Sequence, residues 1–345
     1  ALNRPTILVP ADDLSAILIA ENATELASYF IFPRPPAALP RTLANKRHLY
    51  ELCRRLGVAC PDTIFPNSRE ELLSVTAHME FPVVAKATEG WLLRKGIRST
   101  VIISGREELI DYYENFRHEV PDSMLMIQKM IPASCSEDWF VHGYCDHQSN
   151  PTAIFTGVKL RSYPAFAGAT TLGRSVSNDA LREQVIKLFS AIGYRGIMDL
   201  DFRLDKRDGR YHLLDFNPRI GAQFRLFESQ SGIDVVRALH LDLTGRGVEA
   251  GPQIEGRTFN VEIRDLRASF AYIRSGDLRI KDWLLSQRGI TERAWCASDD
   301  LAPFLLMCLW MPFRAVTRVF GVNPDGADSE EKSPNLLPTD GQRPS

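Results

Sequence analysis

Two short segments in the middle of the chain carry carboxylates at alternate positions of otherwise apolar runs. The first is Asp199-Leu-Asp201, and the second is Asp215-Phe-Asn217, with Arg219 two residues further on. Residues two apart share one face of a β-strand, so each segment is expected to present its polar groups on a single face. Carboxylates brought together on half-buried strands repel one another unless they are protonated or neutralised. A bound cation resolves that conflict.

The chemistry of the candidate ligands indicates the kind of cation. Asp201, Asp215 and the Asn217 amide offer oxygen atoms, which hard metals prefer. So few protein ligands leave room for water and phosphate oxygens, as is usual around Mg²⁺. The alternative is a surface hairpin with solvated acids on its outer face, for which the turn Asp205-Lys-Arg-Asp-Gly209 is typical. The two strands alone support both interpretations equally.

Lysines on or beside predicted strands favour the cation and phosphate site. Lys86 closes the apolar run Pro-Val-Val-Ala, and a buried ammonium group without a partner is costly, so an anion is expected near it. The segment from Glu89 to Gly96 has two glycines and two cations, which is consistent with a mobile loop that closes over phosphates. The chain has no GxxxxGK[ST] sequence, so motif spacing alone does not establish a phosphate loop.

The order of these groups along the chain resembles the ATP-grasp superfamily over roughly residues 42–239. Lys46 lies on a predicted helix, Lys86 ends a strand, and Gln128-Lys-Met-Ile131 ends another, followed by Glu137-Asp138 and the two carboxylate segments. Within the superfamily, the stretch from Thr156 to Thr171 is similar to the carboxylate-amine ligases related to D-aspartate ligase and the carbamoyl-phosphate synthase large chain.

This resemblance implies a nucleotide site with assigned residues. Lys46 and Lys86 would contact the phosphates of ATP. The adenine would bind to the backbone of a hinge, and the ribose to one of two acids; the metal would be Mg²⁺, or Mn²⁺ in its place. The hinge residues are Gln128, Lys129, Met130 and Ile131, the ribose candidates are Glu137 and Asp138, and the metal ligands are Asp201, Asp215 and Asn217.

The resemblance also implies the catalytic residues. Arg219 would stabilise the transferring phosphoryl group or the intermediate, while Lys159 and Arg161, on one strand face, would bind an anionic acyl acceptor or the γ-phosphate. The alternative for this pair is two exposed cations on a strand edge. Asp stands at both metal positions where the family commonly has Glu, and the loop after Lys86 has fewer glycines than is usual. His142 and His147 have no third ligand at metal spacing, so we interpret them as ordinary polar or packed residues.

The elements that must position these residues are antiparallel strand groups interspersed with helices, which predicts an α+β fold. Residues 1–42 are expected to form a partial α/β segment with a proline-rich linker. Residues 43–322 are expected to form the ATP-grasp domain, two α+β subdomains that clamp ATP, with the lid at about 78–130. Residues 196–204 and 210–218 are expected to pair as an antiparallel hairpin, and residues 323–345 to be a disordered tail.

Composition excludes several other classes of protein. The net charge of −2, with no basic stripe, argues against a nucleic-acid binder, and six cysteines without a CxxC pair indicate reduced thiols. No secretory signal is evident, so a cytoplasmic location is expected. The apolar stretch from Leu301 to Phe313 is too short to span a bilayer. It predicts a buried segment, with contact of residues 301–318 with a membrane surface as the alternative.

The function expected from these features is ATP-dependent ligation of a small carboxylic acid to an amine, such as an amino acid or a peptide-like molecule, through an acyl-phosphate. Two alternatives stay open. The chain could be an ATP-binding module without catalysis of its own, or a ligase for a nucleophile other than an amine. A homodimer is a further option.

Overall fold

The computed structural model describes residues 6–93, 100–118 and 120–319, with side chains to Trp310 at the C-terminal end. The expected phosphate loop, Glu89 to Gly96, falls partly outside these residues, and the expected tail, 323–345, falls wholly outside them. The chain divides into two compact units, residues 1–294 and 295–345. The first unit contains three sheets, and each unit is described separately below.

The N-terminal part is a small β-α-β arrangement. Strands β1 (Thr6–Ile7) and β2 (Phe30–Ile31) pair in parallel, with helices α1 (Asp13–Glu21) and α2 (Ala23–Leu26) between them. The Asp12 side chain caps α1 by accepting a hydrogen bond from the Ser15 amide. Helices α3 (Leu39–Ala44) and α4 (Lys46–Leu56) follow, and Gly57 ends α4 in a left-handed conformation.

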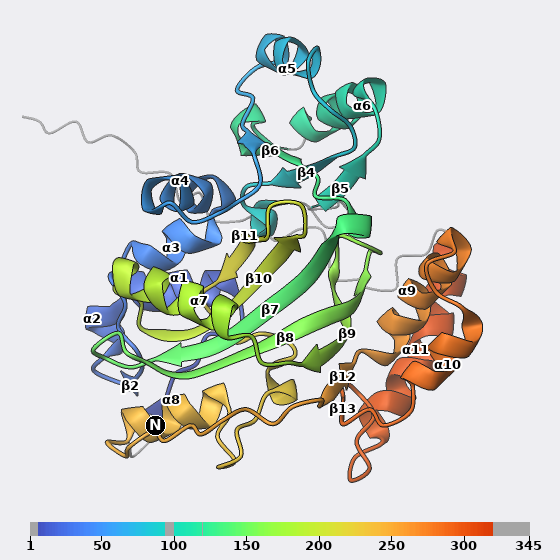
Figure 1. The fold of residues 1–345 in the computed structure, drawn as a ribbon. Helices are drawn as coiled ribbons and strands as arrows, with labels where there is room; N and C mark the ends of the chain where they lie inside the picture. Colours follow the sequence, from blue (N-terminus) through green and yellow to red (C-terminus); the bar gives the residue numbers. More distant parts are fainter. Residues whose placement is uncertain (1–5, 94–99, 119, 320–345) are drawn as a thin grey trace, which may run out of the picture. The chain divides into compact units, whose positions relative to one another are not determined.

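A four-stranded antiparallel sheet forms the next part of the first unit (Figure 1). Its order is β3 (Thr63–Ile64), β6 (Leu125–Lys129), β4 (Val83–Ala87) and β5 (Thr100–Ile103). Helices α5 (Arg69–Thr76) and α6 (Arg106–Arg117) pack on this sheet through an apolar cluster that includes Leu72, Leu109, Tyr113 and Phe116. The 3₁₀ turns η1 (Gly90–Leu92) and η2 (Asp122–Met124) lie in its connections.

The third sheet has seven strands and carries most of the core. Its order is β11 (Arg210–Asn217), β10 (Gly196–Asp205), β7 (Ser136–Cys145), β8 (Pro151–Tyr163), β9 (Ala169–Ser175), β12 (Thr258–Asn260) and β13 (Glu292–Arg293). All neighbouring pairs are antiparallel except β12 and β13. The expected hairpin of β10 and β11 is therefore confirmed.

Helices cover both faces of the seven-stranded sheet, because its strands carry apolar side chains on both faces. Helix α7 (Asp179–Ile192) packs on the face that includes Val141. Helix α8 (Val235–Leu243) packs on the opposite face with Phe140 and Phe155. Adjacent residues of β7 thus point to different layers. Helices α9 (Glu262–Ser275) and α10 (Ile280–Ser286) and the turns η3 (Ala133–Cys135) and η4 (Phe224–Leu226) complete the unit.

The second unit contains helix α11 (Ala302–Val319). We expected its apolar stretch to be buried, but Leu305, Leu306 and Leu309 are exposed, and that prediction is wrong. Among the described residues, no helix has both the length and the apolar character needed to cross a membrane.

Candidate active site

The two carboxylate segments lie side by side on β10 and β11. Asp201 is directly opposite Asp215 in the antiparallel ladder, and Asp199 is opposite Asn217. Like charges placed opposite each other destabilise a strand pair unless they are neutralised. The sequence left open whether these acids face water. The side chains that surround them in the structure answer this question.

Lysines from three other elements meet these carboxylates. Lys46 Nζ, at the start of α4, lies 3.0 Å from Asp215 Oδ1, and Lys86 Nζ, on β4, lies 3.6 Å from Asp215 Oδ2. Lys159 Nζ, on β8, lies 3.2 Å from Asp201 Oδ1. The hairpin is therefore not a solvated surface, since its acids form ion pairs with distant parts of the chain.

Helix α4 is held against β4 where its lysine enters the site. The Lys46 amide donates a hydrogen bond to Thr88 O (3.0 Å), and Asn45 Nδ2 donates one to Glu89 Oε1 (2.6 Å). Asn45 is also the N-cap of α4, since its Oδ1 accepts from the Arg47 and His48 amides. The hydrogen bonds between the start of α4 and the end of β4 thus position both Lys46 and Lys86 beside Asp215. We call this contact the junction of α4 and β4.

The pKa values of the two paired carboxylates are shifted in opposite directions. Burial alone would raise the pKa of Asp215, but the ammonium groups of Lys46 and Lys86 lower it to about 2. Burial raises the pKa of Asp201, and Lys159 only partly opposes this. Burial also lowers the pKa of the Lys86 ammonium. The site therefore holds a charged and a more readily protonated carboxyl beside each other, an arrangement that an added cation would stabilise.

The residues present fit a magnesium ion. Asp215 Oδ1 is buried and, among the described residues, accepts no hydrogen bond of normal geometry in spite of its proximity to Lys46. Asn217 Nδ2 donates to the backbone oxygen of Asp199 (3.1 Å), so its amide oxygen is the atom that remains for a cation. Together with Asp201 these groups form the all-oxygen donor set that suits Mg²⁺.

Arg219 lies next to this pair in a second group of contacting polar side chains, which the sequence did not reveal. Its Nη1 donates to Asp199 Oδ2 (2.9 Å), and its Nε lies 3.4 Å from Asp13 Oδ1. Asp199 Oδ1 in turn lies 3.1 Å from Nε2 of the fully buried His142. We interpreted His142 as an ordinary polar or packed residue; it is fully buried, and in addition it lies beside the carboxylate that holds Arg219. His142 is the residue of β7 opposite Asp199 of β10, a register that appears only in the folded chain.

Gly221 leaves room for the side chains of His142 and Asp199. A Cβ atom at this position would lie 2.3 Å from His142 Cε1 and 2.9 Å from Asp199 Cγ. Such distances are too short for any side chain, so glycine is required for the close approach of the backbone.

The expected adenine hinge lies at the end of β6. A cavity of about 40 Å³ there is lined by residues of both large sheets, including Lys86, Gln128 to Ile131, Arg203 and Leu214. Ordinary ligand pockets measure roughly 300 Å³ or more, so this cavity is smaller than a nucleotide needs. The Lys129 side chain pairs instead with Glu80, at 3.1 Å.

The two ribose candidates are both paired with cations. Glu137 Oε1 lies 2.8 Å from Lys206 Nζ, and Asp138 accepts two hydrogen bonds from Arg203, from Nε at 2.6 Å and from Nη2 at 2.8 Å. Arg203 also donates to Ile131 O (3.1 Å) and to Phe166 O (2.8 Å). This arginine therefore links the hinge to the turn that joins β8 and β9.

Arg161 is not brought to the carboxylate pair. It lies on β8, where the register shifts between Lys159 and Arg161 and again after Arg161, and its guanidinium makes two 2.8 Å hydrogen bonds to Asp265 of α9. Both side chains are buried. The expectation that Lys159 and Arg161 share one face is wrong because of this bulge, and Arg161 instead fixes α9 to the sheet.

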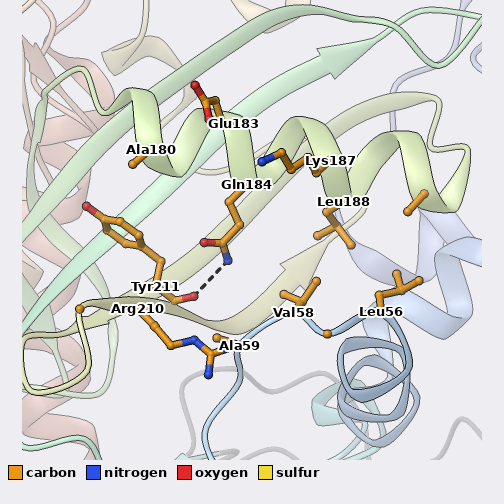
Figure 2. Close-up of a pocket in the computed structure, with 13 residues that line it drawn as sticks. Leu56, Val58, Ala59, Ala180, Glu183, Gln184, Lys187, Leu188, Arg210 and Tyr211 are labelled. Atoms are coloured by element: carbon orange, nitrogen blue, oxygen red, sulfur yellow. Dashed lines mark hydrogen bonds between the residues drawn. The ribbon is translucent and has the colours of Figure 1, made fainter.

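A much larger hollow lies elsewhere in the described residues. Figure 2 shows this pocket of about 540 Å³, between the end of α4, helix α7 and the start of β11. Gln184 Nε2 donates to Tyr211 O (3.1 Å) across it, and Lys187 and Arg210 lie at its walls. None of the candidate site residues lines it, so its size does not mark it as the reaction centre.

Comparisons with known proteins identify relatives of this chain. A family model described as the ATP-binding domain of the carbamoyl-phosphate synthase L chain matches residues 161–242. The D-aspartate ligase of Enterococcus faecium is 27% identical over 243 residues, which cover 67% of this chain and 57% of the relative. The carbamoyl phosphate synthase large chain of Vibrio cholerae is 22% identical over 236 residues, 66% of this chain and 21% of the relative. The chain thus spans little more than half of the first relative and about a fifth of the second.

Solved structures share the fold. The L-amino acid ligase from Bacillus licheniformis has a TM-score of 0.54 at 18% identity, covering 70% of this chain and 58% of that one. The biotin carboxylase domain of the Hydrogenobacter thermophilus 2-oxoglutarate carboxylase, crystallised as a dimer with MgADP and bicarbonate, has a TM-score of 0.53 at 18% identity, covering 68% and 53%.

Proposed function

We propose that this chain, which has the α+β ATP-grasp fold and is related in sequence to D-aspartate ligase and to carbamoyl-phosphate synthase large chains, is an ATP-dependent ligase that joins a carboxylic acid to an amine. One arrangement supports this function above all. Asp201 and Asp215 face each other and are met by lysines from α4, β4 and β8. Fixed cations around a cation-binding carboxylate pair are what phosphoryl transfer requires.

The nucleotide half of the site follows from these residues. Asp201, Asp215 and Asn217 would hold Mg²⁺, which supplies charge neutralisation at the phosphates when it is bound. Lys46 and Lys86 would exchange their contact with Asp215 for the phosphates of ATP. The backbone of residues 129–131 would bind adenine, as the resemblance implies, once the cavity opens.

The acyl half of the site lies around Lys159 and Arg219. An oxygen of the substrate carboxylate attacks the γ-phosphorus of ATP, ADP leaves, and an acyl-phosphate forms. The amine nitrogen then attacks the acyl carbon, phosphate leaves, and the nitrogen loses a proton. Arg219, held by Asp199 and Asp13, is positioned to stabilise negative charge on the transferring group, and Lys159 to bind the acyl acceptor.

A screen for ADP release tests this function. Amino acids, small peptides and cell-wall precursors are supplied as carboxylate and amine with Mg²⁺ and ATP, and mass spectrometry identifies the product of any hit. For the hit pair, Asp201→Asn and Asp215→Asn should each lower the rate by about a hundredfold or more, because the cation site loses a charged ligand. Asp208→Asn, in the exposed turn of the same hairpin, is the control and should keep the rate.

Three outcomes would go against the proposal. Full activity in either site variant removes the metal assignment. Nucleotide binding without ADP release on any pair favours an ATP-binding module. Turnover only with a thiol or bicarbonate favours a ligase for another nucleophile.

Assembly and location stay predictions. A homodimer is expected by analogy with the dimeric biotin carboxylase domain, and light scattering on the purified chain tests it. The cytoplasmic location likewise stays a prediction.

A further inference from the structure

Two helices near the end of the first unit expose large apolar side chains. On α9, Phe270 is 71% exposed, and Leu266, one turn earlier, lies on the same face. On α10, Leu284 is 55% exposed, and Ile280, one turn earlier, and Leu285, the next residue, are also exposed. Single exposed leucines are ordinary, but five large apolar side chains on two consecutive helices form a surface that needs an explanation.

The same two helices carry an excess of exposed positive charge. Within residues 262–288, all of which the structure describes, Asp277 is the one acid in the exposed class. Asp265 is buried against Arg161, and Asp282 pairs with Arg279 at 2.6 Å. Because the whole chain has a net charge of −2, this excess is local. The exposed basic residues are Arg264, Arg267, Arg274, Arg279, Lys281 and Arg288.

The inner sides of both helices are fixed to the rest of the unit. Asp265 of α9 binds Arg161, and Arg161 Nη2 also donates to Ser286 Oγ of α10 at 3.0 Å. Tyr272 Oη accepts from the Phe166 amide at 3.1 Å. The exposure of Leu266 and Phe270 therefore belongs to a helix that is anchored through its other side, and does not come from a frayed end.

We infer that the outer face of α9 and α10, defined by Leu266, Phe270, Ile280, Leu284 and Leu285 with the six basic residues around them, docks on an anionic phospholipid surface. Apolar side chains interspersed with arginine and lysine are the composition of helices that lie in a membrane interface. Each cation near an anionic leaflet adds attraction. This surface lies outside the proposed active site, and the inference does not depend on the proposed function.

A second copy of the chain fits this face less well. A two-fold symmetric dimer places the same patch on both partners, so the excess of cations would face the same excess. Like charges across an interface oppose association. An anionic lipid surface satisfies the apolar and the basic groups together.

Vesicle sedimentation with the full chain tests the inference. The wild-type chain should sediment with vesicles of equal parts phosphatidylglycerol and phosphatidylcholine, only weakly with phosphatidylcholine alone, and less as salt is added. The double variants Phe270→Ser with Leu284→Ser, and Arg267→Glu with Lys281→Glu, should each bind at least about tenfold more weakly. All four positions are exposed, so folding should be kept, and circular dichroism verifies it.

Matched controls come from other exposed positions. Leu18→Ser on α1, where the leucine is 58% exposed, and Arg55→Glu on α4 should bind like the wild type. The inference is overturned if the wild type binds neither kind of vesicle, or if the α9 and α10 variants bind as the wild type does. It is also overturned if these variants dissociate a dimer seen by light scattering. Loss of binding only in Leu305→Ser with Leu309→Ser would assign the contact to α11 instead.

Discussion

Asp215 is the residue on which the proposed site depends most, because one carboxylate receives Lys46 on one oxygen and Lys86 on the other. Its alternation with Asn217 was visible in the sequence, and so was a lysine that needed an anion. The partner of Arg161 was not visible. Asp265 lies 104 residues further along the chain, and no local pattern reports a contact of that separation. The bulge in β8 that turns Arg161 away from Lys159 left no signal in the sequence either.

The stability of Asp215→Asn should depend on pH. The folded pKa of about 2 lies below the ordinary value of 3.8, so the wild-type carboxylate stabilises the fold above about pH 4, and this is lost as the pH falls through about 2. At neutral pH the variant leaves Lys46 and Lys86 without their carboxylate, and we expect a free energy of unfolding lower by about 2–4 kcal/mol. Urea titrations at several pH values measure it.

The difference between wild type and variant should shrink on acidification from about pH 4 to about pH 2. A difference that is constant over this range would show that packing of the side chain matters more than its charge. Asp277→Asn, at an exposed position after α9, controls for the loss of a surface acid.

At the scale of elements, the antiparallel hairpin was predictable because both strands alternate and a short polar turn separates them. The way β10 supports the hinge was not predictable. Arg203, two residues after Asp201, holds Asp138, the Ile131 carbonyl and the Phe166 carbonyl, so one strand of the hairpin fixes both the hinge and the turn after β8. Three partners from separate segments converge only in the folded chain.

Arg203→Lys should weaken nucleotide binding. A lysine keeps the charge, but it has no planar fork to reach three acceptors at once, so the hinge loses support. If the proposed function holds, we expect KM for ATP to rise about tenfold with kcat little changed. Steady-state kinetics at saturating carboxylate and amine measure both. A fall in kcat at constant KM would place Arg203 in the chemical step, and Lys206→Arg on the same hairpin serves as the control.

At the scale of the first unit, two connections lead between the parts that carry the large sheets. Residues 57–62 join α4, which packs with the seven-stranded sheet, to β3 of the four-stranded sheet, and residues 130–135 join β6 to β7. The cavity between these sheets, about 40 Å³, borders the expected adenine site. Two sheets with helices and a nucleotide between them could be expected from the order of the motifs. The size of the cavity could not, because it depends on side chains of both sheets, among them Leu214 and Val84, that line it only in the folded chain.

Nucleotide binding should change the motion of these connections. Mg²⁺ with a non-hydrolysable ATP analogue should slow amide hydrogen exchange in residues 57–62 and 130–135, because a bound nucleotide links both sheets. Helix α8, whose apolar cluster includes no described residue of the four-stranded sheet, should exchange at the same rate with and without it. Mass spectrometry of peptic fragments resolves these segments. Equal slowing of every segment would indicate general stabilisation instead of closure.

The meeting of Lys46 and Lys86 on Asp215 also has a consequence for synthesis of the protein. The lysines leave the ribosome long before the carboxylate, so a growing chain that ends before residue 215 has the cations of the site without their counter-charge. Until β11 is made, the junction of α4 and β4 holds two ammonium groups whose repulsion opposes its closure. Completion of the hairpin is therefore expected to stabilise this junction, because β11 supplies the carboxylate that both ammonium groups contact.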